Sequence, residues 1–253
     1  FDIETIPDTD GGRRLYDVAD LEDADVVQVM HHIRRQKTGN EFLPHHLQRV
    51  VAISAVLRTA DRFTVWSLGT STSTEPELIE RFFDGVDKYS PTLVTWNGSG
   101  FDLPVLHYRA LVHGIQAARY WEVGDNDRDF RFNNYLNRFH YRHLDLMDVL
   151  AGYQGRAVAP LSDLARLAGF PGKLGMDGGQ VWDHYRAGDI EGIRNYCETD
   201  ALNTFLLYLR FERMRGHLNP GEYDSECARI RDFLRGQQKE HWDQFLAAWV
   251  DNA

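Results

Sequence analysis

The chain has 253 residues, of which 43% are hydrophobic and 12% aromatic, enough apolar material for a substantial core rather than global disorder. The formal net charge of −10 argues against a protein that coats duplex DNA through many phosphate contacts, although a nuclease that grips a few nucleotides needs only a local basic groove. With no apolar run near the roughly 20 residues of a membrane span, no secretion signal and only two cysteines, the sequence predicts a cytoplasmic protein that does not enter a membrane.

Strands and helices alternate in the first part of the chain. In chain order the patterns predict a strand at 1–5, a helix at 24–36, strands at 50–58 and 62–68, a helix at 77–88 and a strand at 92–96. The two strands that flank Ala60-Asp61 predict a hairpin, and Asn97-Gly98-Ser99-Gly100 ends the strand before it.

The second part of the chain is mostly helical. We expect a helix from Leu103, a strand at 143–148, and helices at 161–168, 180–187, 189–214 and 222–250. Five glycines between Gly169 and Gly179 predict a loop between the first two of these later helices. The order predicts an α/β fold, with a mixed five-stranded sheet flanked by helices and the last helices covering one side.

Two acids stand on the first predicted strand. Asp2 and Glu4 are two residues apart, so both carboxylates leave the same face. Keeping both ionised is costly unless a cation lies between them, and oxygen ligands of this kind suit Mg²⁺ or Mn²⁺. Taken alone, the pair is better explained as two solvated acids on an exposed strand edge than as a metal site.

Two later motifs also carry acids. Asp102 stands just before a helix, where it would serve as an N-cap, although such a junction also points the side chain at the mouth of the sheet. Tyr196 and Asp200 are four residues apart on a helix and share one face. Taken alone, this pair would be a half-buried core residue, Tyr196, and a surface acid, Asp200.

Together, the order Asp-x-Glu, Asn-x-x-x-Phe-Asp and Tyr-x-x-x-Asp resembles the DEDD superfamily of 3′→5′ exonucleases in its Tyr variant, because Asn195 stands where the His variant has histidine. The chain more closely resembles the predicted 3′→5′ exonucleases related to the proofreading domain of family B DNA polymerases. The likeness extends to about Gly216 and is carried by Phe1–Pro7, Thr95–Gly98, Phe101–Leu106, His143–Asp148, Pro171–Lys173 and Tyr196–Asp200.

The resemblance implies an RNase H-like domain over residues 1–216, followed by a helical extension over 217–253. It also implies two divalent metal ions, Mg²⁺ or Mn²⁺, bridged by Asp2, with Glu4 and Asp200 on the nucleophile side and Asp102 on the leaving-group side. Tyr196 would orient the attacking water, since a phenol pKa near 10 is badly matched to a base at neutral pH.

The substrate implied is the 3′ end of single-stranded DNA or RNA. Thr5, Asn97, Phe101 and Lys173 are the residues expected to contact it, although Asn97 and Phe101 equally fit a turn residue and a core residue. Residues 128–143 combine four arginines with five aromatics, which would guide a nucleic-acid backbone or form a packed surface with solvated arginines.

Other classes compete with a DNA exonuclease. One is a non-catalytic nucleic-acid-binding module on the same fold, and another is an exoribonuclease or a hydrolase of small nucleotides. All four acids and the tyrosine are present, which favours catalysis. The likeness to polymerase domains favours DNA, and a partner protein in repair or replication stays unidentified.

Overall fold

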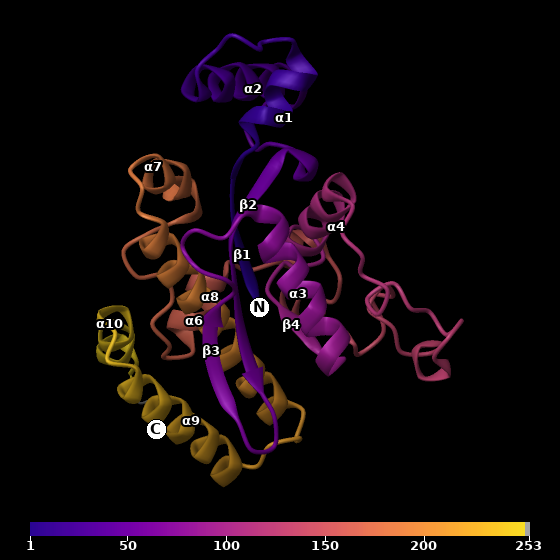
Figure 1. Ribbon diagram of the computed structural model, residues 1–253. Coiled ribbons are helices and arrows are strands. Elements are labelled where there is room, and N and C mark those ends of the chain that lie inside the picture. The colour runs from indigo at the N-terminus through magenta and orange to yellow at the C-terminus, as the bar shows by residue number, and fades with distance from the viewer. Residues whose placement is uncertain (251–253) are drawn as a thin grey trace.

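Two small sheets with helices around them make up the computed structural model, which describes residues 1–250 (Figure 1). In chain order the strands are β1 (Asp2–Pro7), β2 (Gln48–Arg58), β3 (Phe63–Ser67), β4 (Leu93–Thr95) and β5 (His143–Asp145). The helices are α1 (Thr9–Tyr16), α2 (Asp23–Thr38), α3 (Glu75–Tyr89), α4 (Asp102–His113), α5 (Leu146–Leu150), α6 (Leu161–Leu167), α7 (Val181–Arg186), α8 (Ile190–Met214), α9 (Pro220–Gln237) and α10 (Glu240–Ala248), with short 3-10 turns at His45–Leu47, Arg128–Phe130, Gly155–Ala157 and Gly178–Gln180. Within the described residues, no helix combines the length and the apolar character needed to cross a bilayer.

The first sheet has the order β1-β2-β3, with both pairs antiparallel. The predicted hairpin is confirmed: β2 and β3 are joined by a turn in which the Thr59 N–H donates to the Arg62 carbonyl at 2.9 Å. The pairing of β1 with β2 shifts register between Glu4 and Thr5, and such irregularities commonly change where side chains point.

The second sheet is the parallel pair β4-β5. The strand predicted over 143–148 is wrong beyond Asp145, because the Asp145 carboxylate accepts hydrogen bonds from the Met147 and Asp148 N–H groups and caps α5. The same carboxylate therefore ends a strand and begins a helix.

The predicted single five-stranded sheet is not confirmed, since residues 1–250 form sheets of three and two strands. The sheets meet where the Phe1 amino group donates to the Val94 carbonyl at 2.9 Å. Two residues further on, the Ile3 N–H donates to the Asp102 carboxylate and not to a strand carbonyl, so no regular ladder joins β1 to β4. The α/β class with flanking helices agrees with the prediction.

Helix α8 runs through the middle of the molecule and packs on both β1 and β2 (Figure 1). The helix predicted over 222–250 is in fact two helices, because Gln238 takes a left-handed conformation with φ 53° and breaks the run. Ile230, Leu234, Trp242 and Phe245 of α9 and α10 are buried in the same apolar cluster as α8. The proposed division of the chain after residue 216 stays a prediction.

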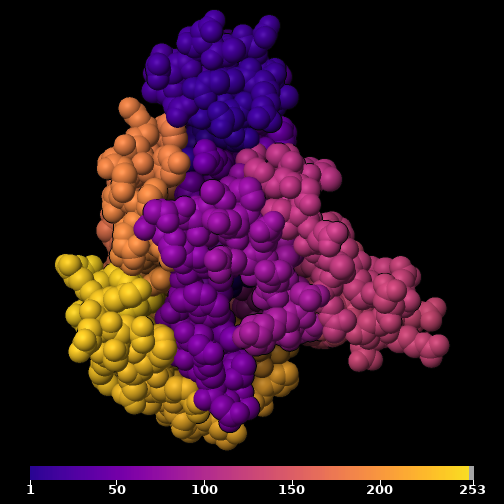
Figure 2. Space-filling view, in the orientation of Figure 1, coloured from indigo at the N-terminus to yellow at the C-terminus, as the bar shows by residue number. Residues whose placement is uncertain are grey.

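The N-terminal helices α1 and α2 form a small lobe that projects from one end of the body (Figures 1 and 2). Its core contains Val26, Met30, Leu43 and Leu47. Helix α1 was not predicted, and Gly12 explains why it packs so closely on α2: a Cβ there would lie 2.5 Å from the Met30 sulfur. The segment after α4 forms a second projection (Figure 2).

A buried ion cluster joins the end of β1, the start of α3 and the middle of α4. Arg109, only 3% exposed, donates to both oxygens of Glu75 at 2.8 and 2.5 Å and to Asp8 at 2.5 Å. Glu75 also accepts from the Val50 N–H of β2 at 2.7 Å and contacts His113. The cluster therefore fixes α4, whose first residue is Asp102, against the first sheet.

Candidate active site

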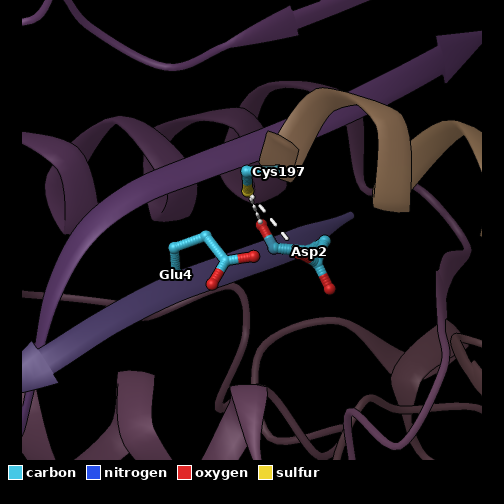
Figure 3. A group of neighbouring side chains, drawn as sticks. All are labelled: Asp2, Glu4 and Cys197. Carbon is cyan, nitrogen blue, oxygen red and sulfur yellow. Dashed lines mark hydrogen bonds between the residues drawn. The ribbon is translucent and has the colours of Figure 1, made fainter. Parts of the chain in front are cut away.

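Asp2 and Glu4 lie on one face of β1, as the two-residue spacing predicts. One oxygen of each carboxylate and the Cys197 sulfur of α8 lie within 4.8 Å of one another (Figure 3). The Cys197 thiol donates to the Asp2 carbonyl at 3.3 Å and approaches an Asp2 carboxylate oxygen at 3.6 Å. The strand and the helix are thus in direct contact at the acids.

Asp102 reaches β1 from the start of α4. It is 4% exposed, and one carboxylate oxygen accepts the Ile3 N–H at 3.2 Å, between Asp2 and Glu4 in the sequence. The N-cap role considered for Asp102 is wrong, because Phe101 occupies the cap position and Asp102 is the first helical residue. Its side chain is therefore directed at the first strand.

Tyr196 and Asp200 are both buried on the face of α8 that meets the acids. Asp200 is 6% exposed, and its Oδ1 has no hydrogen-bond partner within residues 1–250. Leaving a buried carboxylate oxygen without a partner costs about 1–3 kcal/mol or more of folding free energy. This atom is therefore suited to bind a ligand that does not come from the chain itself.

Electrostatics shows that the four acids share one environment. Burial, with repulsion from Asp102 and Asp200, raises the pKa of Asp2 well above its ordinary value, and burial with repulsion from Asp2 does the same to the pKa of Glu4. Burial also raises the pKa of Asp102 to about 7 and that of Asp200 to about 6. Residues from three separated motifs therefore destabilise one another's ionised forms, which a cation among them would reverse.

Cys197, which follows Tyr196 on α8, has a hydrogen-bonding role at the acids. Burial raises the pKa of its thiol, so the sulfur keeps its proton and serves as a donor to Asp2. A protonated thiol is a poor metal ligand, which leaves a set of carboxylate oxygens. That set fits a hard divalent cation such as Mg²⁺ or Mn²⁺.

Asp145 fixes the turn before Asp102 by hydrogen bonding. The carboxylate of Asp145 accepts the Asn97 N–H at 2.9 Å and the Ser99 N–H at 2.8 Å. Asn97 is exposed in a left-handed conformation with φ 66°, a turn position that Asn tolerates. The Asn97 side chain therefore lies on the exposed side of the turn, with its oxygen close to Gly100.

Phe101 is half-buried, and its ring lies 5.7 Å from that of Phe42 and 5.8 Å from that of His45. These partners come from the segment after α2, and no sequence motif pointed to them. The ring is thus part of an aromatic group at the base of the N-terminal lobe.

Lys173 and Thr5 differ in their surroundings. The Lys173 ammonium lies 5.9 Å from the centre of the Tyr196 ring, and its charge lowers the pKa of Glu4 and of Asp200, partly offsetting the effect of burial. Its loop is anchored, because the Lys173 N–H donates to Ser162. The Thr5 hydroxyl instead donates to Gln48 at 3.0 Å within the sheet. The structure brings Lys173 beside the acids.

Residues 40–249 match a protein family described as a predicted 3'-5' exonuclease related to the exonuclease domain of PolB. The chain belongs to this family. The resemblance inferred from the motifs is thereby confirmed. The matched residues include Asp102, Tyr196 and Asp200 but not Asp2 and Glu4, which the structure places next to them.

Two curated relatives are DNA polymerase epsilon catalytic subunits A, one from Emericella nidulans and one from Aspergillus fumigatus. Each is 30% identical to the chain over 142 residues. The alignments cover 54% of the chain but only 6% of each polymerase subunit, so the chain corresponds to a small part of those proteins.

Proposed function

We propose that the chain is a 3′→5′ exonuclease in which Asp2, Glu4, Asp102 and Asp200 hold two divalent cations, Mg²⁺ or Mn²⁺. The observation that carries the proposal is the meeting of four acids from β1, α4 and α8, one of which has a buried oxygen without a partner. Structural acids usually gain arginine or backbone partners, as Glu75 does beside Arg109. The charges of the Lys173 ammonium and the Phe1 amino group lower the pKa values of these acids, but they do not fully offset the effect of burial.

The roles of the protein's own groups follow from their positions. The bound cations would activate the attacking water and stabilise the negative charge on the leaving 3′-oxygen. Asp2, which both Asp102 and Asp200 repel, would be shared by the two cations, with Glu4 and Asp200 as ligands on the nucleophile side and Asp102 on the other. Burial and the neighbouring Asp200 raise the pKa of Tyr196, so its hydroxyl stays protonated, and it would orient the attacking water by hydrogen bonding.

The substrate we propose is the 3′ end of a single strand, with DNA preferred. Support for DNA comes from the relatives, which are DNA polymerase catalytic subunits. Lys173 would contact a phosphate, and Asn97 and Phe101 the terminal nucleotide. The Thr5 hydroxyl is already bonded to Gln48, so Thr5 would contact the substrate only through its position next to Glu4.

The test uses single-stranded DNA and RNA oligonucleotides labelled at the 5′ end, incubated with Mg²⁺, with Mn²⁺ or with a chelator. Asp200→Asn removes one charged ligand with little change in volume. Asp232→Asn makes the same chemical change at an exposed ion pair on α9 and serves as the matched control. We expect a metal-dependent ladder that shortens from the 3′ end, lost in Asp200→Asn and kept in Asp232→Asn.

Other outcomes separate the alternatives. Strands that stay intact in every lane but are retarded on a gel would identify a binding module. Cleavage of dinucleotides alone would identify a small-nucleotide hydrolase, and faster cleavage of RNA an exoribonuclease. Cleavage that Asp200→Asn leaves unchanged would refute the assignment of the four acids.

A further inference from the structure

An aromatic–arginine cluster lies at the surface outside the acidic site. It consists of Arg138, Phe139 and Tyr153, and the two rings are 67% and 38% exposed. The rings meet edge to face with centroids 5.1 Å apart, and the Arg138 guanidinium lies 4.7 Å from the Tyr153 centroid. Large exposed rings grouped in this way are a feature of interaction surfaces.

The cluster is held in place before any ligand binds. Arg138 pairs with Asp148 at 3.2 Å, and the Phe139 N–H donates to the Asn137 side chain at 3.0 Å. Tyr153 has a left-handed backbone with φ 60°, an unfavourable conformation for a bulky residue, and its N–H donates to the Asp148 carbonyl at 2.8 Å. A ligand that stacks on these rings would therefore lose little affinity to ordering them.

Helix α5 links the cluster to the candidate active site. Asp145 at the start of α5 bonds the turn that carries Asn97, and Asp148 in the same helix bonds Arg138. The cluster and the turn before Asp102 are thus attached to neighbouring positions of one short helix. The cluster lies outside the group of four acids.

The segment 128–142, which carries Arg138 and Phe139, has a net charge opposite to that of the whole chain. Residues 128–142 contain four arginines and one acid, Asp129, in a chain of net charge −10. Arg131 lies 5.7 Å from the ring of Phe132, which is itself 82% exposed. Exposed rings beside arginines suit single-stranded nucleic acid, because rings stack on bases and guanidinium groups pair with phosphates.

We propose that Arg138, Phe139 and Tyr153 bind the body of the single strand on the 5′ side of the nucleotide being removed. The inference rests on the proposed function for its substrate class and adds a second contact region to it. Bases would stack on Phe139 and Tyr153 while Arg138 contacts the backbone. Strands long enough to reach the cluster then bind more tightly than strands that occupy only the acidic site.

The test compares binding of a single-stranded DNA 12-mer with binding of a trinucleotide, both fluorescently labelled at the 5′ end. Fluorescence anisotropy is measured with Mg²⁺ in an Asp200→Asn background, so that binding is separated from cleavage. The variant is Phe139→Ala/Tyr153→Ala. Tyr89→Ala is the matched control, because it removes another exposed ring that stacks with a cation, Lys88.

We expect the double variant to weaken binding of the 12-mer about 10- to 100-fold, the effect of losing one or two stacked bases, and to leave trinucleotide binding unchanged. Arg138→Gln should lower the slope of log affinity against log salt by about 0.7. A circular dichroism melting curve checks that each variant is folded.

A double variant that binds the 12-mer as tightly as its parent would overturn the inference and leave the proposed exonuclease intact. A parent that binds neither oligonucleotide would overturn both. The two failures are therefore distinguishable in one titration series.

Discussion

The buried ion cluster around Arg109 gives the sharpest prediction on stability. Replacing Arg109 by Met keeps most of the side-chain volume but removes the guanidinium that contacts Glu75 and Asp8. Both carboxylates are buried, and water has little access to replace the lost partner. We expect Arg109→Met to destabilise the protein strongly.

The magnitude follows from the kind of contact. Breaking a buried pair by removing one partner costs about 3–5 kcal/mol, because it leaves an uncompensated charge. His113 also contacts Glu75 at 2.7 Å and stays as a partner of that carboxylate, so a loss in the lower half of the range is expected. For a chain of this size the melting temperature should fall by about 6–20 °C.

The assay is unfolding in guanidinium chloride followed by circular dichroism, with Arg235→Met as the control. Arg235 pairs with Asp232 on the exposed face of α9, and loss of such a pair costs about 0–1 kcal/mol. The double variant Arg109→Met/Glu75→Gln should recover part of the lost stability. A loss below about 1 kcal/mol in Arg109→Met, with an unchanged denaturant slope, would refute the view that this cluster holds α4 to the first sheet.

Three further predictions concern the acids and their neighbours. Tyr196→Phe should lower kcat about 100-fold with little change in KM, because the hydroxyl would position the attacking water and would not contribute to substrate binding. An equal change in kcat and KM would contradict this role. Mn²⁺ should raise the melting temperature more at pH 8 than at pH 5.5, because protons on Asp102 and Asp200, with pKa values of about 7 and about 6, compete with the cation. Without metal, the melting temperature should instead fall as pH rises from about 4 to 7, because these acids bind protons more tightly in the folded protein than in the unfolded one. Calorimetry at several pH values, with and without Mn²⁺, checks both trends. Glu198→Gln should cost about 1–3 kcal/mol at pH 7 and less in acid in urea unfolding. Burial raises the Glu198 pKa, but the hydrogen bond from His241 and other contacts outweigh burial and hold that pKa below its ordinary value, so the stabilisation is lost as pH falls through the lowered pKa; equal costs at neutral and acidic pH would count against a charge-dependent contact.

The parts of the fold that follow local patterns were predictable. The hairpin of β2 and β3 and the long helix α8 have repeating apolar positions that need no knowledge of distant contacts. Helix α1 was not predicted because Gly11-Gly12 weakens its helical pattern. A glycine is needed at position 12 because Met30 of α2 packs against it, a contact that the sequence does not reveal. The break at Gln238 falls on a glutamine, and the nearby Gly236 is still helical, so no glycine or proline stands at the break itself.

The candidate site shows the same division. The spacing of Asp2 and Glu4 fixed their common face, and the order of the acidic motifs identified the family that the comparison confirmed. The contact of Cys197 with Asp2 joins residues 195 positions apart, and only the packing of α8 on β1 creates it. The single sheet of five strands failed because Ile3 bonds a side chain of α4 and not a neighbouring strand.

The burial of α8 restricts where this protein can change. One side of the helix presents Tyr196 and Asp200 to the acids, while Glu198 on another side bonds Ser67 of β3 and His241 of α10. A substitution in this stretch alters the acids and the packing of the C-terminal helices together. Under the proposed function, new substrate preferences are therefore easier to acquire at the exposed turn around Asn97 than in the helix that carries Tyr196 and Asp200, and divergence among relatives should concentrate at that turn.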